Sequence, residues 1–354
     1  MERVLVCLLA STRAHQLTFP SFKRQVLDEL NGDLAVALAI DEKYDYANPF
    51  WQHAKYRWTA PDFRDVGESF DLAQRWLCYQ HNVPAPDWRP MLQIKGHWQG
   101  GIRSQDPQPT YSSVQTFCRW LLLNGLQRDE VLDRYDRFVI TRSDFVWLSP
   151  HPPLSILDRS AVWLPDGENY GGLNDRHVVA SRADIVNCLN IIEDMLLHPV
   201  ELCEEMKRQP GYYHWNNELV LSHHFRRKGL FDKVKRFPYV MYMARHVNDE
   251  RLAFKPGHYE PAVGHYVKYK KEYRAASAYA TVIRTRADWE ARGWRQFDPM
   301  AVSAPVPLLR RVRYACETGY VTIRSALRRP GRVGRLARFS KRMLGVRDPS
   351  NDLS

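Results

Sequence analysis

Short apolar runs alternate with amphipathic stretches over the first third of the chain. Residues 3–10 (RVLVCLLA) are almost continuously apolar, which is typical of a strand buried on both faces. Apolar positions then recur at helical spacing up to Leu30, with Ser21 as the candidate N-cap. Residues 34–40 (LAVALAI) form a second apolar run. A strand, a helix and a second strand in this order predict a parallel sheet covered by helices.

The same kind of pattern continues to about residue 245. We expect helices near residues 112–125, 181–197 and 217–228, and strands near residues 137–141, 161–164 and 234–243. Residues 42–110 are rich in Trp, Tyr and Pro, and we interpret them as long irregular loops, which often carry function on an α/β scaffold. Beyond residue 245 the pattern weakens.

The net charge is concentrated near the C-terminal end. Of the formal net charge of +11, residues 305–354 supply +9, from 11 Arg and one Lys against three acids, and residues 1–304 carry only +2. A domain that binds nucleic acid would carry a basic stripe of its own, so we do not expect a nucleic-acid partner for the body. Residues 305–354 predict one or two basic amphipathic helices whose interleaved apolar residues favour contact with an anionic membrane. Docking on a partner enzyme and a solvated end are the alternatives.

The six cysteines are scattered, with no CxxC pair. They predict buried thiols in a reducing compartment and not a disulfide framework or a zinc site. The apolar run near the N-terminus is too short for a signal peptide, and no stretch has the length of a transmembrane helix. We therefore expect a cytoplasmic protein. No GxxxxGK[ST] or GxGxxG motif is present, which argues against a kinase or a nicotinamide enzyme.

The segment YDRFVITRSDFVW, residues 135–147, carries an acidic group at the end of a predicted buried strand. A carboxylate there loses solvation unless a charged partner meets it, and a divalent cation is a suitable partner for Asp144. Arg142 lies two residues earlier, on the same side of an extended segment. An Arg–Asp ion pair at a strand end is the alternative, and from this segment alone it is at least as good an explanation.

Two further segments carry candidate chemistry. The paired glycines Gly171 and Gly172 permit close approach of backbone to a ligand, and Asp175 follows them; a plain turn before a helix is the alternative. Glu218 lies near the start of a predicted helix, where it either caps the helix or acts as a general base.

Taken in order, the strand-end triplet, the glycine loop and the helix-borne acid resemble the layout of GT-A glycosyltransferases. The segments YDRFVITRSDFVW, NYGGLNDRHVVASRADI and NNELVLSHHF are similar to bacterial and viral nucleotide-sugar transferases of the surface-polysaccharide type. The resemblance covers roughly residues 1–245. It implies an α/β fold with a Rossmann-like, mixed and mostly parallel sheet flanked by helices, followed by a basic helical C-terminal extension.

The resemblance also implies a division of the chain. Residues 1–245 would be the catalytic domain, with the nucleotide sugar bound by residues 1–150 and the acceptor side in residues 151–245. Residues 246–304 would complete this domain, and residues 305–354 would be the basic amphipathic tail.

Site residues follow from the same resemblance. Asp144 would bind Mn²⁺ or Mg²⁺ on the donor diphosphate. The first acidic position of the family's triplet is occupied by Arg142 in this sequence. Phosphate binding by Arg142 and a metal-free enzyme are therefore alternatives. Glu218 would be the base and Asp175 the second catalytic candidate. The remaining implied residues are Ser11, Arg13 and Asp41 for the nucleoside, Gly171 and Gly172 for the donor sugar and acceptor, and one of His246, His258 or His265 as a further metal ligand.

The expected activity is transfer of a sugar from a nucleotide-sugar donor to a glycan or lipid-linked acceptor in surface polysaccharide or capsule biosynthesis. We expect the protein in the cytoplasm, where its tail would hold it at the inner face of the membrane. A non-catalytic GT-A-like scaffold recruited through the tail is the main alternative, because an arginine occupies the first acidic position. A protein that binds nucleic acid, or any polyanion, through residues 305–354 is a weaker alternative.

Overall fold

A computed structural model describes residues 2–103, 112–209, 214–245 and 257–291. The predicted basic tail at residues 305–354, Cys316 and His246 lie outside the described residues. The described elements all belong to one compact unit, Met1–Asp298. The division of the chain given above stays a prediction.

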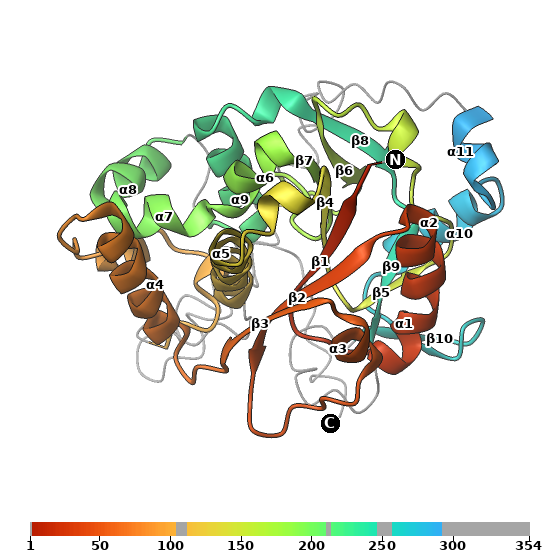
Figure 1. Cartoon of the computed structure of the whole chain (residues 1–354), viewed down its shortest axis with the longest axis horizontal. Helices are drawn as coiled ribbons and strands as arrows, with labels where there is room; N and C mark the ends of the chain where they lie inside the picture. The colour runs from red at the N-terminus through yellow and green to blue at the C-terminus, as the bar shows by residue number, and fades with distance from the viewer. Residues whose placement is uncertain (1, 104–111, 210–213, 246–256, 292–354) are drawn as a thin grey trace, which may run out of the picture. The chain divides into compact units, whose positions relative to one another are not determined.

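A seven-stranded sheet runs through the centre of this unit, in the order β3-β2-β1-β4-β7-β6-β8 (Figure 1). Neighbouring strands are parallel except at β7, which is antiparallel to both β4 and β6. The strands are β1 Val4–Ala10, β2 Asp33–Ile40, β3 Tyr56–Pro61, β4 Arg137–Thr141, β6 Val162–Asp166, β7 Val178–Ser181 and β8 Val234–Pro238. The predicted α/β fold with a mixed, mostly parallel sheet flanked by helices is confirmed.

Helices cover both faces of this sheet, because successive side chains of a strand point to opposite faces. Leu5, Cys7 and Leu9 of β1 pack in one core with residues of α5, whereas Val4, Val6 and Leu8 pack in another with residues of α1 and α2. The helices are α1 His15–Phe22, α2 Asp28–Leu30, α3 Pro49–His53, α4 Val66–His81, α5 Ser112–Arg128, α6 Arg182–Leu189, α7 Ile191–Leu197, α8 Pro199–Lys207, α9 Asn217–Arg227, α10 Lys270–Ala280 and α11 Arg286–Ala291. A π-helical segment, Lys23–Leu27, joins α1 to α2.

A smaller antiparallel sheet of four strands, in the order β10-β11-β9-β5, begins directly after β4. Its strands are β5 Phe145–Trp147, β9 Met241–Arg245, β10 His258–Glu260 and β11 His265–Val267. Phe145 is paired with Met243, and the Ala244 backbone N donates to the Asp144 carbonyl oxygen at 2.8 Å. The small sheet therefore places the end of β9 beside the end of β4.

Several element predictions are wrong in detail. Residues 42–110 are not irregular, since they contain α3, β3 and α4; β3 is an edge strand whose exposed positions are polar, so its apolar signal is weak. The first helix begins at His15 and not at Ser21, whose hydroxyl donates within the helix to the Thr18 carbonyl. The single strand expected at residues 234–243 is two strands that belong to different sheets.

The prediction that the cysteines are buried thiols is confirmed for the five that the structure describes. Cys7, Cys78, Cys118, Cys188 and Cys203 are all buried free thiols. Within the described part of the chain, none of the helices combines the length and apolar character needed to cross a membrane.

A buried pair of histidines makes the stability of the fold depend on pH. His151 Nε2 lies 3.3 Å from His177 Nε2, and both rings are fully enclosed. Burial lowers the pKa of His151 to about 4 and, together with the neighbouring ring, holds the pKa of His177 well below its usual range. In the unfolded chain each side chain titrates near 6.5.

The free energy of unfolding should therefore fall as the pH falls below 6.5, because the two histidines bind protons in the unfolded state but not in the native state. We expect a loss of roughly 2 kcal/mol for each histidine between pH 7 and pH 5. Urea unfolding at several pH values measures it. His151→Gln should lower stability at pH 7 but flatten the pH dependence, and an unchanged slope would contradict the assignment.

Candidate active site

The loop after β4 holds a buried carboxylate that is bound by arginine. Asp144 is 1% exposed, and Arg142 donates to both of its oxygens, from Nε at 3.0 Å and from Nη2 at 2.9 Å. Burial alone would raise the pKa of Asp144, but the surrounding arginines outweigh it and hold this pKa well below its usual range. The Arg–Asp ion pair that the sequence leaves open as an alternative is therefore formed in the structure.

The loop after β1 lies against this triplet. The Ser143 hydroxyl donates to the carbonyl oxygens of Ser11 and Arg13, at 2.7 and 3.1 Å. The Arg13 guanidinium lies 4.0 Å from the Asp144 carboxylate, with 30% of its side chain exposed. Two of the residues assigned to nucleoside binding thus meet the triplet at the carboxyl ends of adjacent parallel strands, where α/β proteins place ligands.

The small sheet adds two more basic side chains, those of Arg245 and Lys268. Arg245 ends β9 and donates from Nη1 to Asp144 at 3.3 Å. Lys268 follows β11, where its backbone N donates to the Met243 carbonyl at 2.9 Å. Burial, followed by the nearby arginine charges, lowers the pKa of Lys268 to about 6. Three guanidinium groups therefore surround one carboxylate, and the side chain of Lys268 lies within reach of their charges.

The glycine loop is packed against the start of α9. Leu173 N donates to the Glu218 carbonyl oxygen at 3.0 Å, and Asn216, the N-cap of α9, donates from its amide to the Tyr170 carbonyl at 3.0 Å. A Cβ on Gly172 would lie 2.0 Å from that Glu218 oxygen. Gly172 thus permits the close approach that sets the position of Glu218.

A second close approach supports the same turn from the other side. Gly96 forms an isolated parallel bridge with Trp215, and a Cβ at Gly96 would lie 1.9 Å from the Trp215 carbonyl oxygen. Trp215 N also donates to the Lys95 carbonyl at 2.9 Å. Part of the Trp-rich segment therefore positions α9.

Glu218 and Asp175 form a pair of interacting carboxyl groups. Burial, and then the negative charge of Asp175, raises the pKa of Glu218 to about 8. The side chain of Asp175 is 9% exposed, and Arg119 donates to its backbone carbonyl at 2.7 Å. A carboxyl group that loses its proton near neutral pH suits a general base.

The two halves of the cluster are joined by an amide and a buried ion pair. With its oxygen turned toward Arg142, the Gln115 amide accepts from Arg142 Nη1 at 2.7 Å and donates to Asp175 Oδ2 at 3.1 Å. Arg176 is paired with the buried carboxylate of Glu272 on α10. The Arg176 guanidinium also lies 5.0 Å from the centre of the Tyr269 ring. These contacts leave little freedom to the loop that carries Asp175.

Asp41 is not brought into this cluster. It is exposed, and its carboxylate accepts from the Lys43 backbone N at 3.0 Å. Within the described residues, it forms no hydrogen bond or ion pair with Asp144 or Glu218. Its assignment to the nucleoside stays a prediction.

The downstream histidines have other surroundings. His258 is exposed in β10, and His265 in β11 is hydrogen-bonded through Nε2 to the Tyr242 hydroxyl at 2.9 Å and through Nδ1 to the Val263 carbonyl at 2.9 Å. Among the residues that the structure describes, no three His, Cys, Asp or Glu side chains are grouped so as to hold a metal ion.

Sequence reasoning missed Arg245, Lys268 and Gln115. Arg245 follows an apolar strand, as Asp144 does, so the strand-end argument applied to Asp144 points to it as well. Lys268 has no such local signal, because the pairing of β11 with β9 brings it to the site.

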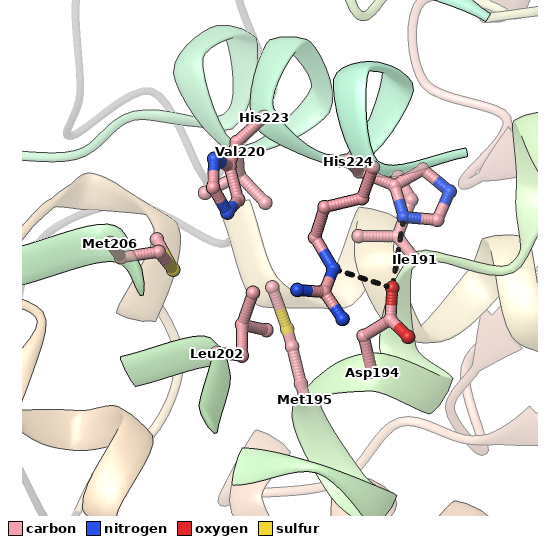
Figure 2. Close-up of a pocket in the computed structure, with 9 residues that line it drawn as sticks. Ile191, Asp194, Met195, Leu202, Met206, Val220, His223 and His224 are labelled. Atoms are coloured by element: carbon pink, nitrogen blue, oxygen red, sulfur yellow. Dashed lines mark ion pairs between the residues drawn. The ribbon is translucent and has the colours of Figure 1, made fainter. Parts of the chain in front are cut away.

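A separate pocket lies between α7, α8 and α9 (Figure 2). Its polar centre is Asp194, whose carboxylate lies 3.5 Å from Arg227 Nε, 3.7 Å from His224 Nδ1 and 3.2 Å from Lys228 Nζ. Its other lining residues are mostly apolar side chains of the three helices. We interpret its polar part as an ion-pair cluster that joins the helices.

Replacing Gly172 should weaken the contact between the glycine loop and α9. Gly172→Ala places a methyl group against the Glu218 backbone, so we expect a loss of about 1–3 kcal/mol in the free energy of unfolding. Gly171→Ala is the matched control: its Cβ would meet only a Leu219 methyl at 3.7 Å, although its φ of 87° adds left-handed strain of about 1 kcal/mol. Urea unfolding compares the two, and equal losses would show that the collision is relieved without cost.

Comparisons with known proteins give little information about this chain. No family model matches the chain, and no curated protein matches it. Among solved structures, a protein of Desulfovibrio desulfuricans G20, provisionally assigned as a nucleotide-diphospho-sugar transferase, is similar over 67% of this chain and 80% of its own, with 12% identity and a TM-score of 0.30. We draw no function from a similarity at that level.

Proposed function

We propose that the protein is a glycosyltransferase that uses a nucleotide-sugar donor. The observation that carries the proposal is the presence of two features in one unit: Glu218 on α9, whose pKa burial and Asp175 raise to about 8, and a set of buried and half-buried basic side chains at the carboxyl ends of β1 and β4. Such a site offers both a proton acceptor and a place for a negatively charged leaving group.

The chemistry of sugar transfer needs both features. Departure of the nucleoside diphosphate develops negative charge, which preorganised guanidinium and ammonium groups stabilise in a site of low dielectric constant. In the same step the acceptor hydroxyl attacks the anomeric carbon and gives up its proton. Glu218 accepts that proton, and Asp175 keeps the affinity of Glu218 for a proton high.

The acceptor and the setting of the reaction belong to the same proposal. We propose a glycan or a lipid-linked acceptor, in surface polysaccharide or capsule biosynthesis, in the cytoplasm. Residues 305–354 would bring the enzyme to the anionic inner face of the membrane through their arginines and interleaved apolar residues.

A non-catalytic scaffold is the second candidate, and one observation favours it. The carboxylate of Asp144 is fully engaged by arginines, as in a site retained only for structure. A scaffold without a nucleotide site would show no rise in melting temperature with nucleoside diphosphates, whereas ligand binding to the native state raises it.

The test of the proposal is a donor screen. Purified full-length protein is incubated with UDP-, GDP-, CMP- and dTDP-sugars, with and without Mn²⁺, and slow donor hydrolysis is measured. Hydrolysis of one donor by the wild type but not by Glu218→Gln supports the proposal. No hydrolysis of any donor, together with no thermal shift, overturns it in favour of the scaffold.

A further inference from the structure

The position that the GT-A resemblance gives to a divalent cation is occupied by guanidinium groups. Arg142 donates to both carboxylate oxygens of Asp144, and Arg245 donates to one of them. Arg13 approaches the same oxygen at 4.0 Å. A Mg²⁺ or Mn²⁺ ion would have to displace these donors and would then face three cationic side chains. The residues present do not fit a metal ion.

Among the described residues, Arg142 and Arg245 share a single carboxylate, that of Asp144. Arg176 is paired with Glu272 and Arg142 with Asp144, and no carboxylate of the described residues forms an ion pair with Lys268. Arg245 is 6% exposed, and its Nε is a buried donor that lacks a hydrogen-bond partner in the part of the chain that the structure describes. Buried donors without partners are costly, and like charges held together repel. An anion would relieve both costs.

We infer that Arg13, Arg245 and Lys268, with Arg142 held in place by Asp144, form a pyrophosphate-binding site that works without a divalent cation. The inference rests on the proposed function in taking the diphosphate of a nucleotide as the ligand. Asp144 acts here as a positioning residue that orients guanidinium groups and binds no metal. The cations supply the charge that a bound metal would otherwise bring to the leaving group.

The geometry and chemistry of the side chains suit this ligand. Guanidinium groups offer paired N–H donors that match phosphate oxygens. A bound phosphate would also favour the protonated form of Lys268, whose ammonium offers three donors on a flexible stem. Arg13 and Arg142 have 30% and 14% of their side chains exposed and Lys268 is half-buried, so a ligand can reach these three groups from solvent. Arg245, at the end of β9, is buried.

The test is calorimetric titration of the full-length protein with inorganic pyrophosphate and with UDP, GDP, CDP and dTDP, in EDTA and in millimolar Mn²⁺ or Mg²⁺. We expect the dissociation constant of the bound ligand to agree within about threefold between EDTA and metal. Lys268→Gln should weaken binding at least tenfold. Lys271→Gln, which removes the same charge from an exposed position three residues away, should leave it unchanged.

The outcomes separate this inference from the proposed function. Binding that disappears in EDTA and returns with Mn²⁺, or binding that Lys268→Gln leaves intact, overturns the inference even if a donor is hydrolysed. Metal-independent binding of pyrophosphate that Lys268→Gln abolishes, with no donor hydrolysed, supports the inference and removes the proposed reaction. Absence of all pyrophosphate and nucleotide binding, in a protein whose melting curve shows it to be folded, overturns both.

Discussion

Glu218→Gln is expected to lower kcat for sugar transfer by about two to four orders of magnitude, the usual contribution of a general base. The amide has nearly the shape of the carboxyl group, so the loop contacts made by the Glu218 backbone stay in place. Steady-state transfer with the donor found in the screen measures the loss. Glu201→Gln, at a carboxylate with 62% of its side chain exposed on α8, is the matched control and should retain wild-type activity.

The pH dependence of the rate gives an independent check on the same residue. Since burial and Asp175 raise the pKa of Glu218 to about 8, most of this group is protonated at pH 7 and its basic form accumulates as the pH rises. The rate should therefore rise between pH 6.5 and pH 8.5 in the wild type. Residual activity of Glu218→Gln should lack this rise. A rate that is flat over this range, or a variant that retains the wild-type rate, would show that another group accepts the proton.

Asp144→Asn is expected to destabilise the fold by about 3–5 kcal/mol, the usual cost of breaking a buried ion pair from one side. The amide keeps the volume of the side chain but leaves the surrounding arginines without their counter-charge. A role confined to ligand binding would predict that removing this carboxylate abolishes turnover and spares the fold. Its burial and its arginine partners change that expectation.

Urea unfolding at pH 7 measures the effect, and Asp28→Asn is the matched control, because Asp28 forms an exposed ion pair with Lys23 whose loss should cost well under 1 kcal/mol.

The low pKa of Asp144 also predicts the direction in which its contribution to stability changes with pH. Its contribution to stability is complete above the unfolded pKa of 3.8 and is lost as the pH falls further. The stability difference between wild type and variant should therefore shrink in acid. A difference below 1 kcal/mol at pH 7 would mean that solvent or a rearranged partner replaces the carboxylate.

The parts of the fold that the sequence predicts well are those whose signal is local. β1 and β4 are continuous apolar runs, and both were placed within one residue of their observed bounds. α9 begins at an asparagine cap and ends before Gly229, as its sequence indicates. The sequence does not predict β3 and α4, because about half of their positions face solvent. In a segment that is also rich in Trp and Pro, such a mixture of polar and apolar residues resembles a loop.

The residues of the candidate site also differ in whether a local sequence signal predicts them. Arg13, Asp144 and Glu218 follow or begin regular elements, so position in the pattern was enough to select them. Arg245 and Lys268 enter through the pairing of β9 with β5 and β11, and no pattern within a short window reports a pairing between segments about 100 residues apart. The presence of three cations at Asp144 is thus a property of the tertiary structure.

The pairing of β5 with β9 also sets an order of events as the chain folds. The seven strands of the large sheet are all present by Pro238, whereas the cations that neutralise Asp144 from the small sheet come from residues 241–268. A nascent chain that ends at residue 240 would hold the whole scaffold of the large sheet, with a buried carboxylate still short of two of its cations. Arg245 and Lys268 would reach the neighbourhood of Asp144 only after β9 and β11 have been made and β9 has paired with β5.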